Sequence, residues 1–140
     1  MPEKEENKQK ELQQKYMELQ MISQQMQQYT KQVEMLENQI LDLDSTNEAL
    51  SDLKKTKEGT KILSPIASGI FVQSKLEDNQ EVLVNVGSNT TVKKTIDGAK
   101  ELILEQKKEI VRFRTELESN IAKFTSDAKK IENELFNLTK

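Results

Sequence analysis

The sequence predicts a mostly α-helical fold: a long antiparallel two-helix coiled coil with two central β-hairpins, which is about four strands. In both outer parts of the chain, apolar residues recur at steps of three and four, the heptad pattern of a coiled coil. Between residues 60 and 94 the period changes to two, as in half-buried strands. Charged residues make up 32% of the chain and aromatic residues only 4%, which suits exposed helices that bury a narrow stripe.

The first helix is predicted by an unbroken heptad pattern. From Leu19 to Leu43 the apolar residues alternate by three and four without a fault. Two polar residues, Lys15 and Asn47, also fall in this seam. Such a residue either fixes the register of the helix pair or is simply tolerated there. Lysines in the last turn suit the negative end of the helix dipole, and Gly59 then offers a left-handed cap.

The middle segment carries strand and turn chemistry. Ile62 and Leu63 are expected to form a first strand that Pro65 ends, and three further strands follow, separated by polar turns. Two hairpins leave open strand edges and an apolar face, and open edges invite pairing with another chain. An assembly surface is therefore predicted, with packing on the chain's own coiled coil as the alternative. The residues expected to assemble are Ile62, Leu63, Ile70, Phe71, Val72, Val82, Val84 and Val86.

The second helix is expected to begin after Thr95, a favourable N-cap residue. Gly98 in its first turn is unfavourable, and the sequence offers no reason for it. The seam is expected to pass through Gln106 and Phe113, with a stutter after Leu117 that locally relaxes the supercoil. Since two helices with seams can bury them against each other, we expect an antiparallel pair with both chain termini at its open end.

No catalytic, cofactor or metal site is expected, and the chain is predicted not to be an enzyme. It contains no cysteine and no histidine, which removes thiolate chemistry and the most common acid–base catalyst and metal ligand. A net charge of −3 argues against a general nucleic-acid binder. The absence of a signal peptide or an apolar stretch long enough to span a membrane favours a cytoplasmic protein.

The stretch ILSPIASGIFVQSKLEDNQEVLVNVGSNTTVKKTIDGAK, residues 62–100, resembles the alpha-class subunits of the prefoldin family. The segment around Pro65, the GIFV and VLVNVG strands and the VKKT run into the helix carry the resemblance. Beta-class subunits have a single hairpin, so two hairpins favour the alpha class. The resemblance extends over the chain and implies a single domain over residues 1–140, with helices at about 5–58 and 95–139 around hairpins at 60–94.

The resemblance also implies a function. Prefoldin is a hexamer of two alpha and four beta subunits, whose hairpins combine into β-barrels. Its coiled-coil tips hold unfolded proteins and pass them to a group II chaperonin without ATP. The implied partners are therefore beta subunits, a second alpha chain, unfolded proteins and that chaperonin, with no nucleic acid, membrane or cofactor.

Apolar residues near both ends of the chain fit such tips. Several lie off the strict seam, where the helix pair does not use them fully, and methionine adapts to varied apolar partners. Helix ends also fray, so seam residues there open at low cost. The residues expected to bind unfolded clients are Leu12, Tyr16, Met17, Met21, Leu135, Phe136 and Leu138.

Two other interpretations use the same coiled coil. A structural tether or adaptor would need the rod and the hairpins but no client binding, and the off-seam apolar residues argue mildly against it. A DNA-binding zipper would need a basic region beside the heptads, and residues 1–18 hold at least as many acids as bases.

Overall fold

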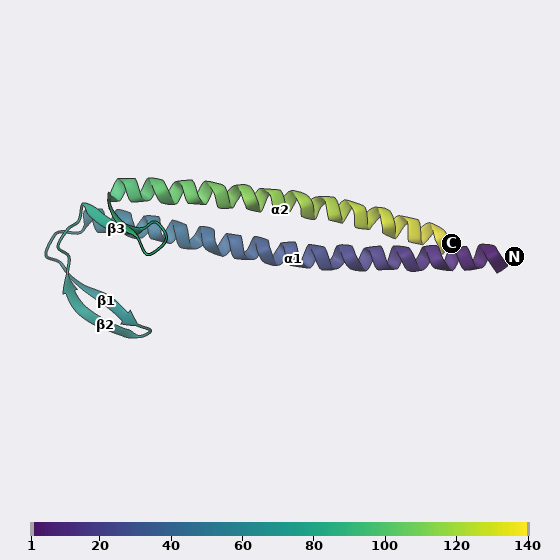
Figure 1. Ribbon diagram of the computed structural model, residues 1–140, viewed down its shortest axis with the longest axis horizontal. Coiled ribbons are helices and arrows are strands. Elements are labelled where there is room, and N and C mark those ends of the chain that lie inside the picture. Colours follow the sequence, from purple (N-terminus) through teal and green to yellow (C-terminus); the bar gives the residue numbers. More distant parts are fainter. Residues whose placement is uncertain (1, 140) are drawn as a thin grey trace. The chain divides into compact units, whose positions relative to one another are not determined.

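The structure is a computed structural model that describes residues 2–139. Along the chain lie α1 (Pro2–Lys55), β1 (Lys61–Ala67), β2 (Ile70–Lys75), β3 (Glu81–Asn85), β4 (Thr91–Thr95) and α2 (Ile96–Leu138) (Figure 1). The predicted class, mostly helical with two hairpins, is confirmed. Within residues 2–139, no helix combines the length and the apolar character that a membrane span requires.

The chain divides into two compact units. The terminal unit comprises Met1–Asn38 and Ile110–Lys140, which hold the outer parts of α1 and α2. The central unit comprises Gln39–Glu109, which holds both hairpins and the helix segments that flank them.

In the terminal unit, α1 and α2 run side by side in opposite directions (Figure 1). Lys15 forms an ion pair with Glu134, and the rings of Tyr29 and Phe124 lie 5.6 Å apart between centroids. As the residue number on α1 rises from 15 to 29, the number of its partner on α2 falls from 134 to 124. The two helices are therefore antiparallel. From Leu12 to Leu36, every residue of the predicted α1 seam is partly buried and every residue between them is exposed. The heptad prediction for α1 is confirmed.

The predicted seam of α2 is wrong at two positions. Gln106 is exposed and Phe113 is 53% exposed, whereas Lys107 and Arg114 are partly buried in their place. Lysine and arginine carry long aliphatic stems that cover apolar surface while their charged ends reach water or a partner. The Lys107 ammonium reaches Asp44 Oδ1 at 2.7 Å. Heptad spacing alone therefore pointed to Gln106, and hydrophobicity pointed to Phe113.

This correction also moves the stutter. From Lys107 to Leu138 a buried seam of α2 alternates regularly by three and four, with Val111 and Asn120 partly buried beside it. The stutter predicted after Leu117 is therefore absent. Two successive steps of four occur earlier, from Ala99 to Ile103 and from Ile103 to Lys107. The supercoil is thus locally relaxed within the central unit, close to the hairpins.

The hairpins of the central unit are separate two-stranded antiparallel sheets, β1 with β2 and β3 with β4. The expectation that Pro65 ends the first strand is wrong, because β1 continues to Ala67. β1 has only one neighbouring strand, and proline is tolerated on such an edge because it need not donate a ladder hydrogen bond. The pairing register shifts between Pro65 and Ala67, which marks a bulge.

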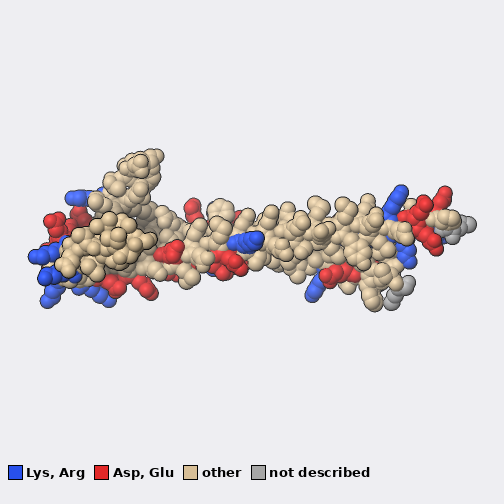
Figure 2. Space-filling view, turned by 90° about the horizontal axis from the view of Figure 1, so that it is seen from below, with Lys and Arg blue, Asp and Glu red and all other residues tan. Residues whose placement is uncertain are grey.

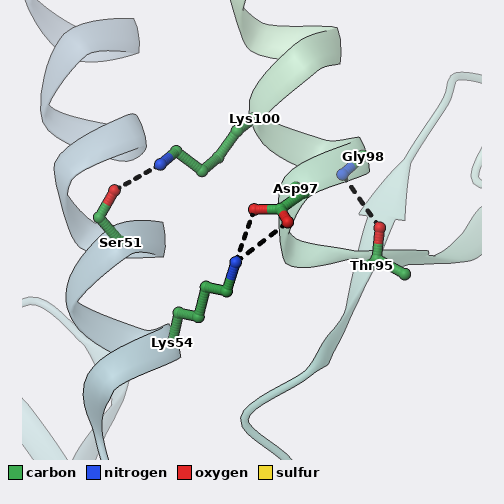
Figure 3. Close-up of polar contacts among 6 residues, drawn as sticks. All are labelled: Ser51, Lys54, Thr95, Asp97, Gly98 and Lys100. Atoms are coloured by element: carbon green, nitrogen blue, oxygen red, sulfur yellow. Dashed lines mark hydrogen bonds and ion pairs between the residues drawn. The ribbon is translucent and has the colours of Figure 1, made fainter.

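The start of α2 anchors the second hairpin to the helices. Ile96 is 2% exposed, and its amide donates to the Gln80 carbonyl at 3.0 Å. Thr95 acts as the predicted N-cap, since its Oγ1 accepts a hydrogen bond from the Gly98 amide at 3.0 Å (Figure 3). A Cβ at position 98 would lie 3.0 Å from that oxygen, so the glycine gives the capping hydroxyl room.

Polar contacts also join α1 to α2 beside this cap. The Lys54 ammonium lies 3.0 Å from both carboxylate oxygens of Asp97, in the first turn of α2. The Lys100 ammonium donates to Ser51 Oγ at 2.7 Å (Figure 3). The lysine at the end of α1 and the aspartate at the start of α2 each suit the local helix dipole. The two helices are therefore held together where the chain enters and leaves the hairpins.

Candidate functional site

The hairpins present an uncharged surface. No charged residue occurs from Ile62 to Ser74 or from Val82 to Val92, in a chain that is 32% charged. Figure 2 shows broad uncharged surface over the hairpins, bordered by charged side chains. Large apolar side chains lie open there, among them Ile66 at 69% and Leu83 at 68% exposed. Exposed apolar surface of this kind marks an interaction site.

The first hairpin is apolar on both faces. The register pairs Pro65 with Phe71 on the face that also carries Leu63, and pairs Ser64 with Val72 on the face that also carries Ile62. A strand that is apolar on both sides is typical of one that is covered on both sides. This hairpin therefore has two surfaces that the described chain leaves open.

The second hairpin is apolar mainly on one face. Val84 pairs with Val92, and Val82 and Val84 are partly buried. The opposite face carries Leu83, paired with Lys93, and is exposed. Of the predicted assembly residues, only Val82 and Val84 are partly covered. The exposed ones are Ile62, Leu63, Ile70, Phe71, Val72 and Val86.

Three exposed residues of this surface, Ile66, Leu83 and Val92, lie outside the set predicted from the sequence. Ile66 lies beyond Pro65, where the sequence predicts that the first strand ends. Leu83 alternates with the valines of β3 and so lies on the other face of the strand. Leu83 shares its face of the strand with the polar residues Glu81 and Asn85, because side chains two residues apart point to the same side. These polar residues are the signal that this face is the outer one.

The second apolar surface lies near the chain ends, in the terminal unit. The four off-seam residues predicted there are all exposed: Tyr16 at 59%, Met17 at 63%, Met21 at 65% and Phe136 at 64%. The seam residues behave differently. Leu12 and Leu138 are partly buried, and Leu135 is only 7% exposed.

The polar seam residue Lys15 sits at this level of the coiled coil. Its ion pair with Glu134 brings the segment that carries Tyr16 opposite the segment that carries Phe136. The hydrogen bond to Glu134 raises the pKa of Lys15 above its ordinary value. Lys15 therefore stays charged and links the two helices, which fits a role in register.

Comparison with known proteins assigns the chain to a family. A family model described as prefoldin subunit matches residues 22–140. The prefoldin subunit alpha of Methanopyrus kandleri is 35% identical over 117 residues, which is 84% of this chain and 74% of that protein. The prefoldin subunit alpha of Methanobrevibacter smithii is 35% identical over 77 residues, which is 55% of this chain and 52% of that protein.

A solved structure agrees with these relatives in fold. The cryo-EM structure of filamentous PFD from Methanocaldococcus jannaschii superimposes with a TM-score of 0.76 at 26% identity, over 84% of this chain and 97% of that chain. The family model covers most of this chain, and the relatives carry the name of alpha subunits. The chain therefore belongs to the prefoldin family of chaperone subunits, within its alpha class.

Proposed function

We propose that this chain works as a single prefoldin-like domain over residues 1–140 and holds unfolded proteins without ATP. It delivers them to a group II chaperonin in the cytoplasm. The observation that carries the proposal is the set of exposed off-seam side chains near the chain ends, Tyr16, Met17, Met21 and Phe136, each about 60% exposed. In a helix pair these off-seam residues keep more than half of their surface exposed, so another protein can cover that apolar surface.

The hairpins assemble the complex in this proposal. Two copies of the chain and four beta subunits join through their hairpins into β-barrels, with the alpha chains in contact with each other. Both faces of the β1–β2 hairpin are open and apolar, and each hairpin has free strand edges. Strand pairing with neighbours satisfies the edges, and barrel closure covers the apolar faces.

Weak contacts at several tips then hold the client. Each exposed apolar side chain contributes a modest free energy when a client covers it, at about 25 cal/mol per Å² of buried area. Several tips that act on one chain raise the effective affinity without any single tight site. Methionine, with its flexible thioether, fits varied client side chains. Release needs no chemical step, because each contact breaks on its own.

A truncation tests this proposal. The alpha chain, with and without about its first 20 and last 10 residues, is produced together with its beta partner, and the mass of each complex is measured by native mass spectrometry. Both complexes are expected to contain two alpha and four beta chains, because the hairpins are intact. Only the full-length complex is expected to suppress aggregation of a denatured protein. Retained suppression by the truncated complex, or no suppression by either, would favour a structural tether.

A further inference from the structure

Two lysines stand directly opposite each other at the base of the β1–β2 hairpin. Lys61 begins β1 and Lys75 ends β2, and the register pairs them across the two strands. Residues opposite each other in an antiparallel pair share a face, so both lysine side chains stand on the face that carries Leu63 and Phe71. Both lysines are exposed, and neither forms an ion pair within residues 2–139.

This arrangement costs stability in the isolated chain. Like charges directly opposite each other destabilise an antiparallel pair, whereas opposite charges stabilise it. A glutamate at position 61 or 75 would remove the repulsion, and every residue of the hairpin between these positions is uncharged. The chain therefore keeps two positive charges together where an acidic or neutral residue would suit the hairpin better. A negative charge supplied from outside the chain would offset this cost.

The backbone at the base of the hairpin holds the lysine pair in a defined place. The strand ladder continues past the pair, since the Leu76 amide donates to the Thr60 carbonyl at 3.0 Å and the Gly59 amide donates to the Leu76 carbonyl at 2.7 Å. Leu76 is only 9% exposed, so the residue that follows Lys75 is buried in the central unit. Charges on an anchored segment are positioned in advance, as a binding site requires.

The remainder of the hairpin defines the register of an added strand poorly. A slip of one residue turns every side chain of a strand to the opposite face, which is costly when only one face is apolar. Both faces of the β1–β2 hairpin carry large apolar residues, and no residue from Ile62 to Ser74 is charged. The lysine pair is the charged feature of these two strands, and it can fix the register that the apolar residues leave open.

We infer that Lys61 and Lys75 bind a carboxylate on a β-strand of the beta subunit that joins an edge of this hairpin. The inference rests on the proposed assembly and names the chemistry by which the two kinds of chain recognise each other. Neighbouring strands lie about 4.7–4.9 Å apart, so an aspartate or glutamate at the same level of the added strand stands beside the nearer lysine. Its charge relieves the repulsion and aligns the added strand with the hairpin.

A second copy of the same hairpin does not supply this carboxylate. Antiparallel pairing of two copies over the length of β2 would put Lys75 beside Ile70 of the other copy. The same pairing over the length of β1 would put Lys61 beside Ala67. Parallel pairing would put lysine beside lysine, a repulsion that keeps free edges of identical chains apart. The proposed contact between two alpha chains then uses the apolar faces of the hairpins and not these edges.

Charge reversals test the lysine pair in the assembled complex. Lys61→Glu and Lys75→Glu each place opposite charges across the hairpin, so the hairpin itself is stabilised while the site for a carboxylate is lost. Lys57→Glu is the matched control, because it changes the net charge equally at an exposed residue between α1 and β1. Each alpha chain is produced with the beta partner, and mass photometry on dilution gives the concentration at which half of the complex has dissociated.

Both reversals are expected to raise the half-dissociation concentration by about tenfold or more, because repulsion replaces attraction at the interface. Lys57→Glu is expected to stay within about twofold of the parent, since an exposed charge outside the interface contributes little. Circular dichroism confirms equal helical content. In the parent complex, a carbodiimide, which joins an amine to a carboxylate in contact with it, is expected to link Lys61 or Lys75 to a peptide of the beta subunit, identified by mass spectrometry.

The outcomes separate this inference from the proposed assembly. Parent-like dissociation of both reversal variants would overturn the inference, and the lysines would then serve only to prevent aggregation through the strand edge. An equal loss with Lys57→Glu would overturn it too, because net charge would explain the effect. A cross-link to Glu81 of an alpha chain, or no cross-link to the beta subunit, would refute the assigned partner. All of these results leave the assembly standing, whereas failure of the parent chains to form a complex refutes the assembly itself.

Discussion

Replacing Phe136 by glutamine tests whether the exposed residues near the chain ends bind unfolded client proteins. The side chain lies close to the end of α2 and is 64% exposed. Glutamine is a good helix former, so the substitution removes apolar surface with little loss of helix propensity. The expected result is a complex of unchanged composition that binds an unfolded protein more weakly.

The size of the effect follows from the exposed area. An aromatic side chain presents about 150–250 Å², so roughly 130 Å² of Phe136 remains open to a client. At about 25 cal/mol per Å², full burial would contribute about 3 kcal/mol. A client that covers half of this area gains about 1.5 kcal/mol, which is a factor of about ten in affinity.

The matched control is Phe113→Gln. Phe113 lies on the same helix and in the same terminal unit, and it is 53% exposed, so the two substitutions remove similar apolar area. It lies well away from the chain ends in sequence, and it is not among the predicted client-binding residues. Fluorescence anisotropy titrations of a labelled unfolded protein with the parent and both variant complexes give the two changes in affinity.

A loss of about tenfold for Phe136→Gln, with a change under about twofold for Phe113→Gln, would support the assignment. Equal losses for both variants would mean that clients bind any apolar residue along the coiled coil. No loss for either would mean that the exposed aromatic residue at the chain end is ordinary helix surface. Either of these results refutes the reasoning.

Two further predictions concern the helix cap and the polar seam. Gly98→Ala should stabilise the protein by less than the about 1 kcal/mol typical of a helix interior, because the new methyl meets Thr95 Oγ1 at 3.0 Å. In a Thr95→Ala background the full gain is expected, and a double-mutant cycle from urea denaturation that shows no coupling would contradict this. Lys15 has a pKa raised above its ordinary value of 10.5 by the hydrogen bond to Glu134, so its stabilising effect is present below that value and lost as the pH rises through the raised pKa. Thermal melts from about pH 9 upward should therefore show a steeper alkaline decline for the parent than for Lys15→Met, and parallel declines would argue against the pair.

Local patterns in the sequence predicted much of this fold. The α1 seam, the Thr95 cap and the existence of two hairpins all depend on residues close together in the chain. A heptad stripe, a capping hydroxyl three residues before an amide, and alternation around a turn are local features, and each is confirmed. The exposure of Tyr16, Met17 and Phe136 also follows from their off-seam positions, since a residue outside the stripe points away from the partner helix.

The tertiary structure decided what depends on the neighbouring segment. In the α2 seam, Lys107 and Arg114 stand where Gln106 and Phe113 were predicted. Their long aliphatic stems pack against the partner helix while their charged ends reach water or a polar group, and a hydropathy value does not describe this behaviour. The continuation of β1 past Pro65 depends on having one free edge. The lysine pair of the first hairpin depends on the strand register, which places Lys61 opposite Lys75. Periodicity determines which face of a helix is buried, whereas only the packed partner determines how well that face is filled.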